Sequence, residues 1–124
     1  MNEGRLVVVA DDERDIVELV AIVLGRAGYD VITAADGERA LELIRERRPD
    51  LCVLDGRMPG LAGHEILQRL RQDPETADTK VLILTATIDD EREIRRHGVN
   101  SDGFMKKPFE ADALLGEVER LLTA

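Results

Sequence analysis

The chain has 124 residues, of which 44% are hydrophobic and 35% charged, and its formal net charge is −9. This length and balance are typical of a single globular domain, here residues 1–124, and argue against a disordered chain. The negative charge argues against direct binding of nucleic acid or of an anionic membrane surface. The charge suits cations and basic protein surfaces, although solvated helix faces also account for much of it.

The sequence shows no feature of export or membrane insertion. Its apolar stretches are too short for a transmembrane helix, and its first residues lack the charged-then-apolar layout of a signal peptide. The single cysteine, Cys52, cannot form an internal disulfide and lies in an apolar run, which indicates packing in a reducing compartment. We therefore expect a cytoplasmic protein without a membrane partner.

Short apolar runs predict five buried strands. They lie at residues 7–10, 31–34, 51–54, 81–85 and 103–106, and the last run is the weakest. The third run ends in a carboxylate, Asp55, and the turn-forming residues Gly56, Pro59 and Gly60 follow it.

Segments with helical periodicity alternate with these strands. Asp12 is expected to cap the first helix, which carries apolar residues at the spacing of one buried face. These residues are Ile16, Leu19, Val20, Val23 and Leu24. Asp36 and Gly37 open the second helix, and Ile66, Leu67 and Leu70 mark the third.

The last two helices differ in character. The fourth, residues 89–97, is short, highly charged and almost without apolar residues after Ile94. The fifth is amphipathic, with Leu114, Leu115, Val118, Leu121 and Leu122 on one face. Five strands alternating with five helices predict a doubly wound α/β domain, in which helices cover both faces of a five-stranded parallel sheet. Periodicity does not predict the strand order.

Chemically active side chains follow four of the strands: Asp11 and Asp12 the first, Asp55 the third, Thr85 the fourth and Lys107 the fifth. The carboxyl ends of parallel strands lie along one edge, where such sheets bind ligands. Clustered carboxylates repel one another unless a cation lies among them, and oxygen ligands of this kind suit Mg²⁺. An acidic metal site that faces a lysine and a hydroxyl is suited to hold a phosphoryl group.

Each of these residues also has an ordinary interpretation. Asp55 can simply begin a turn, Thr85 can fill a strand, and Lys107 can be a solvated charge. The neighbouring Lys106 is an alternative to Lys107, because successive strand residues point to opposite sides. The residues taken singly leave these alternatives open.

In combination, these motifs resemble the receiver domain of two-component response regulators, the family that includes the stand-alone chemotaxis receiver. The resemblance covers residues 6–122. It implies a flavodoxin-like topology. The motifs that carry it are Asp11-Asp12, Asp55 with Met58-Pro59-Gly60, Thr85-Ala86 and Lys107-Pro108-Phe109. It implies a phosphorelay function, in which Asp55 accepts a phosphoryl group from a sensor histidine kinase or a phosphotransfer protein. The domain would catalyse its own phosphorylation without being a turnover enzyme.

The resemblance also implies a cofactor, Mg²⁺. Asp12, Asp55 and the main-chain carbonyl of Arg57 would bind it directly, and Asp11 would act largely through water. Lys107 and Thr85 would contact phosphoryl oxygens, and Lys107–Pro108 would be a cis peptide.

A switch is implied as well. Thr85 would move toward the phosphoryl group, and Phe104 would fill the space that it leaves. The downstream partner would then bind the face formed by the fourth helix, the fifth strand and the last helix, with contacts from Arg92, Arg95 and Arg96. Receivers that drive winged-helix transcription factors typically carry basic residues on the last helix, which form a charged dimer face. This chain has Glu117 and Glu119 at the matching positions, so we do not expect that dimer.

Three rival functions are to be distinguished from this one. A flavodoxin-like cofactor binder needs a glycine- and hydroxyl-rich phosphate loop after the first strand, where this chain has Asp11, Asp12 and Glu13. An aspartate-based phosphatase keeps its nucleophile after the first strand and adds a substrate-capping domain, and nothing in this sequence suggests such a domain. A degenerate receiver, which binds partners without being phosphorylated, stays open as the alternative.

Overall fold

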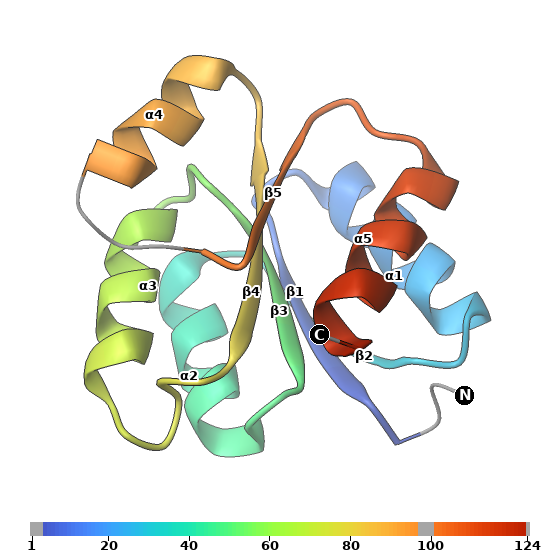
Figure 1. The fold of residues 1–124 in the computed structure, drawn as a ribbon, viewed down its shortest axis with the longest axis horizontal. Coiled ribbons are helices and arrows are strands. Elements are labelled where there is room, and N and C mark those ends of the chain that lie inside the picture. The colour runs from blue at the N-terminus through green and yellow to red at the C-terminus, as the bar shows by residue number, and fades with distance from the viewer. Residues whose placement is uncertain (1–3, 97–100, 124) are drawn as a thin grey trace.

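The computed structural model describes residues 4–96 and 101–123. Within these residues, five strands alternate with five helices (Figure 1). The elements are β1 (Leu6–Ala10), α1 (Arg14–Arg26), β2 (Asp30–Ala34), α2 (Gly37–Arg47), β3 (Leu51–Asp55), α3 (Gly63–Gln72), β4 (Lys80–Thr85), α4 (Ile88–Arg96), β5 (Gly103–Lys106) and α5 (Ala111–Thr123). The predicted alternation is confirmed. The expected end of the fourth helix, His97, lies outside the described residues.

All five strands are parallel, in the order β2-β1-β3-β4-β5. The central strand β3 pairs with β1 on one side and β4 on the other, and all five of its residues are buried. The ends of β1, β3, β4 and β5 are therefore neighbours at one edge of the sheet, as the doubly wound fold requires.

Helices cover both faces of the sheet. The helices α2, α3 and α4 cover one face, and α1 and α5 cover the other (Figure 1). Successive strand residues point to opposite faces, so that Val8 belongs to the core layer beneath α2, α3 and α4, while Val7 and Val9 belong to the layer beneath α1 and α5. Both layers of the core are largely aliphatic. In the described part of the chain, none of the helices has the length and apolar character needed to cross a bilayer.

One expectation for the buried face of α1 is wrong. Val20 and Leu24, one turn apart, are buried as predicted, but the Leu19 residue is 42% exposed. A helix turns by about 100° per residue, so the face that buries Val20 carries Leu19 toward solvent. Ile16 and Val23 are partly buried and pack against the core.

The cap of α1 also differs from the expectation, whereas that of α2 agrees with it. Asp12 does not cap α1: the cap position is Glu13, without a side-chain cap bond, and the Glu13 main-chain N–H donates to Asp11 Oδ1 at 2.9 Å. The Asp36 side chain does cap α2, because its Oδ1 accepts from the main-chain N–H of Arg39 at 2.8 Å. The carboxylate of Asp11, rather than that of Asp12, thus holds the turn between β1 and α1.

Candidate functional site

Five polar residues chosen from the sequence lie along one edge of the sheet. Asp11 and Asp12 follow β1, Asp55 is the last residue of β3, Thr85 is the last residue of β4, and Lys107 follows β5. Because these four strands are consecutive neighbours in the sheet, their ends bring side chains from distant parts of the sequence together.

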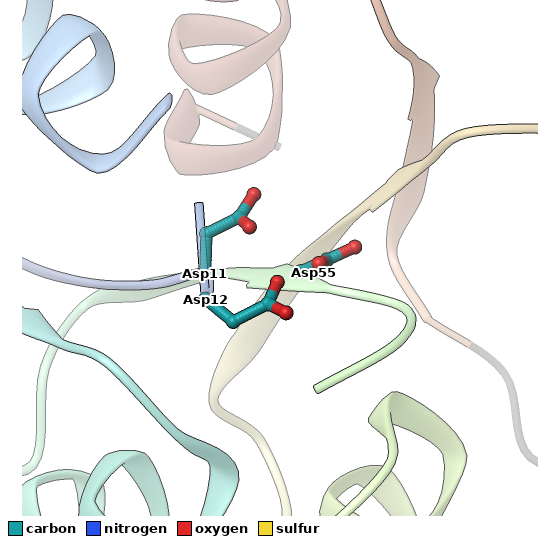
Figure 2. A group of neighbouring side chains, drawn as sticks. All are labelled: Asp11, Asp12 and Asp55. Atoms are coloured by element: carbon teal, nitrogen blue, oxygen red, sulfur yellow. The ribbon is translucent and has the colours of Figure 1, made fainter. Parts of the chain in front are cut away.

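Three carboxylates form the centre of this edge. Asp11, Asp12 and Asp55 each offer an oxygen, and these oxygens lie within 4.8 Å of one another (Figure 2). Asp11 and Asp55 are buried, with 1% and 6% of their surface exposed, whereas Asp12 is exposed. The cluster is therefore open to solvent on the side of Asp12, and its donor set can hold a metal ion.

The Lys107 ammonium lies against this cluster. Its Nζ is 2.7 Å from Asp11 Oδ2, 3.5 Å from Asp55 Oδ1 and 3.8 Å from Glu13 Oε1, and only 10% of its side chain is exposed. Lys106 is exposed, so Lys107 rather than Lys106 is the lysine at the site. The Lys107 main-chain N–H donates to the carbonyl of Thr85 at 2.7 Å, and the peptide bond that follows Lys107 is cis.

One ammonium does not satisfy the acidic groups fully. Asp11 Oδ2 is buried and makes a close ion pair with Lys107, yet it accepts no well-directed hydrogen bond. Buried acceptors of this kind are uncommon in folded proteins. The oxygen therefore retains capacity for a further cation or a water bound to one.

The titration of two groups reflects this crowding. Burial raises the pKa of Asp55, the Asp11 carboxylate raises it further, and Lys107 and the Arg57 N–H oppose these effects only in part, so that the pKa reaches about 7. Burial alone would lower the pKa of Lys107, but the carboxylates of Asp11, Asp55 and Glu13 outweigh it and raise the pKa above its usual value. Lys107 is therefore a fixed positive charge at neutral pH.

Arg57 and Thr85 lie beside the acidic cluster. The Arg57 main-chain N–H donates to Asp55 Oδ1 at 3.3 Å, which holds the start of the loop after β3 against the carboxylate. Thr85 is 4% exposed, and its hydroxyl donates to the carbonyl of Met105 at 3.4 Å. The Thr85 hydroxyl is thus hydrogen-bonded to the neighbouring strand β5.

Phe104 lies on β5, opposite Ile83 of β4 in the register. Its side chain is partly buried and packs against the core layer that contains Ile83 and Ile94. The guanidinium carbon of Arg95 lies 4.5 Å from the centroid of its ring. Phe104 is therefore shared between the core and the surface of α4.

Two features of the site were missed by the sequence reasoning. Glu13 lies within reach of Lys107, and the shortest Lys107 contact is to Asp11 rather than to Asp55. The sequence does contain a signal for the contact of Glu13, because Glu13 is a third acidic residue directly after Asp11 and Asp12. The preference for Asp11 depends on side-chain conformations that no sequence pattern encodes.

Comparisons with known proteins identify the family of the chain. The model of the response regulator receiver domain matches residues 7–119. The chain belongs to the receiver domain family. The alkaline phosphatase synthesis transcriptional regulatory protein PhoP of Bacillus subtilis is 40% identical to it, over 98% of this chain and 49% of the relative. The chain spans about half the length of the curated relatives that it matches first.

Solved receiver structures show the same fold. The chemotaxis response regulator CheY4 of Vibrio cholerae is 33% identical, with a TM-score of 0.88, covering 95% of this chain and 98% of that one. The receiver domain of the sensor histidine kinase PA1611 of Pseudomonas aeruginosa has a TM-score of 0.90 at 23% identity, covering 98% of this chain and 99% of that one. The chain is therefore a receiver domain of the two-component, phosphorelay type with the flavodoxin-like topology.

Proposed function

We propose that Asp55 is the residue that accepts the phosphoryl group. A carboxylate oxygen of Asp55 attacks the phosphorus of a phosphohistidine; a P–O bond forms, the P–N bond breaks, and its electron pair stays on the imidazole nitrogen. The observation that carries this proposal is the position of Asp55 at the end of the central strand, with Lys107 Nζ 3.5 Å from its Oδ1 and two further carboxylates beside it.

The residues at this edge fit Mg²⁺. The supporting observations are the three carboxylate oxygens within 4.8 Å of one another and the solvent-facing side at Asp12. In addition, the buried Asp11 Oδ2 pairs with Lys107 at 2.7 Å but accepts no well-directed hydrogen bond. Asp12, Asp55 and the main-chain carbonyl of Arg57 would hold the ion, with Asp11 acting largely through water. When bound, Mg²⁺ neutralises charge on the transferred phosphoryl oxygens. The PA1611 receiver structure carries magnesium in its active site cleft; for this chain the donor set is the support.

Lys107 and Thr85 position the phosphoryl group. The Lys107 ammonium, held by Asp11 and already close to Asp55, binds one phosphoryl oxygen. The Thr85 hydroxyl, at the end of the neighbouring strand, donates to another. Both groups act in a largely buried setting, where a charged hydrogen bond is stronger than it is in water.

The reaction defines the upstream partner and the character of the protein. A sensor histidine kinase or phosphotransfer protein supplies the phosphohistidine, and the chain modifies its own side chain rather than turning over a substrate. We place this exchange in the cytoplasm, without a membrane partner and without direct binding of nucleic acid by this domain. The net charge of −9 supports the last point.

Phosphorylation changes the face formed by α4, β5 and α5. The new dianion attracts the Thr85 hydroxyl away from the Met105 carbonyl, and Phe104 moves into the space beside the sheet. The helix α4 follows easily, because Ile94 is its one fully buried apolar side chain among the described residues. A downstream protein binds this face, with Arg92, Arg95 and Arg96 as candidate contacts.

The test is Mg²⁺-dependent labelling of the chain by a small phosphodonor such as acetyl phosphate. The wild-type chain should acquire a hydroxylamine-labile label, and Asp55→Asn should acquire none while remaining folded by circular dichroism. Asp112→Asn, which changes an exposed carboxylate on α5, is the matched control and should label normally.

Labelling also decides the alternative. A wild-type chain that takes up no label would favour the degenerate receiver, which binds partners without phosphorylation. A label that persists in Asp55→Asn would show that the acceptor is another residue. No observation at the site favours the degenerate receiver, because Asp12, Asp55, Thr85 and Lys107 are all present at the described edge.

A further inference from the structure

Three arginines of α4 look equivalent in sequence, but one of them differs in its surroundings. Each pairs with an acidic residue of its own helix: Arg92 with Asp89 at 3.8 Å, Arg95 with Glu91 at 3.5 Å and Arg96 with Glu93 at 3.0 Å. Among the described residues of α4, Arg95 alone makes a cation–ring contact. Its guanidinium carbon lies 4.5 Å from the centroid of the Phe104 ring.

The surroundings of Phe104 make this contact consequential. The ring packs against the core layer that contains Ile83 and Ile94, and the guanidinium of Arg95 lies over its face. Glu91 holds the same guanidinium from the preceding turn, and its side chain is only 29% exposed. The Phe104 ring is thus held between the core and an anchored cation.

We propose that Arg95 is a positioning residue that holds Phe104 in its resting position and so opposes the switch. The inference rests on the proposed function, in which Phe104 and Thr85 form a two-state pair. A contact made in one state alone shifts the equilibrium toward that state. The ring leaves the guanidinium when it moves toward the space beside Thr85, so the stacking stabilises the unphosphorylated state.

The size of the effect follows from the exposure of the pair. Arg95 is 57% exposed, so the contact belongs to the weak end of cation–π interactions, equivalent to about a two- to fivefold shift of the equilibrium. If the resting state predominates, removing the contact increases the population that binds a phosphoryl mimic by the same factor.

The first measurement is the affinity for beryllofluoride, a phosphoryl mimic, in Mg²⁺. Arg95→Gln should lower the half-saturating concentration about two- to fivefold relative to wild type. Arg92→Gln is the matched control, since it removes the same charge and a similar intrahelical ion pair but no ring contact. Loss of a positive charge alone weakens binding of an anion, so tighter binding by Arg95→Gln has the opposite sign from a simple charge effect.

The second measurement reports the ring itself. The chain contains two phenylalanines, Phe104 and Phe109, so fluorophenylalanine labelling gives two ¹⁹F signals, the second an internal reference. In Arg95→Gln without beryllofluoride, the Phe104 signal should move toward the position that it takes in the beryllofluoride complex of wild type. In Arg92→Gln it should not move.

The results for wild type and for Arg95→Gln test the proposed function and the role of Arg95 separately. A wild-type chain that binds no beryllofluoride in Mg²⁺ overturns the proposed function and this inference with it. Beryllofluoride binding that is equal in wild type and Arg95→Gln, or a Phe104 signal that does not move toward the bound position, overturns the inference alone.

Discussion

At the scale of single residues, Asp55 combines two conflicting requirements. It must be ionised to act as a nucleophile, yet burial and the Asp11 carboxylate raise its pKa to about 7. The Lys107 ammonium offsets this only in part. A bound cation would therefore serve the nucleophile as well as the phosphoryl group, because it favours the ionised form of Asp55.

The raised pKa of Asp55 predicts how stability depends on pH in the absence of divalent cations. The folded-state pKa of about 7 lies above the ordinary value of 3.8, so the carboxyl contributes stability that is complete below pH 3.8 and lost as the pH rises through 7. The loss is at most about 1.4 kcal/mol per pH unit. Urea unfolding followed by circular dichroism at about pH 5 and about pH 8 should show a smaller change for Asp55→Asn than for wild type. Equal changes would contradict the raised pKa.

Some of the contacts between single residues at the site could be predicted from the sequence, and others could not. The polar residues at the ends of β1, β3, β4 and β5 were predictable as neighbours, because parallel strands place their carboxyl ends at one edge. The short Lys107–Asp11 contact and the stacking of Arg95 on Phe104 were not, since both depend on side-chain conformations.

At the scale of elements, the contact between α2 and the loop after β3 leaves no room for a side chain at Gly37. A Cβ there would lie 2.8 Å from the Cβ of Leu61 and press on its main-chain carbonyl oxygen. Gly37→Ala should therefore lower the free energy of unfolding by about 1–3 kcal/mol in urea titrations.

Gly116 in α5 provides the control for this substitution. A Cβ there meets nothing within 4 Å, so Gly116→Ala should raise the free energy of unfolding by about 0.5–1 kcal/mol through its better helix propensity. If Gly37→Ala left the free energy of unfolding unchanged or raised it, as Gly116→Ala should, the close approach of α2 to the Leu61 loop would not be a real constraint.

Element boundaries were predictable where local chemistry decides them. The alternation of strands and helices and the Asp36 cap follow from short-range patterns. The strand order could not be predicted, because hydrophobic periodicity indicates which residues are buried but not which strands are neighbours. The role of Asp102 could not be predicted either. Its carboxylate accepts from the Val81 main-chain N–H at 2.8 Å and pairs with Arg71 of α3 at 3.0 Å. That contact joins residues that only the completed fold brings together.

At the scale of the whole molecule, Mg²⁺ should stabilise the fold, because it relieves repulsion within the acidic cluster. A ligand that binds only the folded state at roughly ten times its Kd adds about 1.4 kcal/mol. Thermal melts by calorimetry or circular dichroism are required, since the chain has no tryptophan. Asp12→Ala should lose most of the Mg²⁺ effect, while Asp15→Ala, which removes a charge from the first turn of α1, should retain it. An unchanged Mg²⁺ effect in Asp12→Ala would argue against the site.

The switch is also a property of the whole molecule, since it joins Asp55 to the face of α4, β5 and α5. Thr85→Ala should still accept a phosphoryl group but lose most of the beryllofluoride-dependent amide shifts in α4 and β5, a coupling of about 1–3 kcal/mol. Thr33→Ala, an exposed threonine on β2, should keep them. Amide shifts by NMR that are equal in wild type and Thr85→Ala would show that the signal travels by another route.

Asp55 is the proposed site of attachment of the phosphoryl group. The most direct measurement is borohydride reduction of the phosphorylated chain, which converts an acyl phosphate to an alcohol, followed by peptide mass spectrometry. We expect homoserine at position 55 and unmodified aspartate at positions 11 and 12. Homoserine at either of those positions, or an aspartate at position 55 in a fully labelled chain, would contradict it.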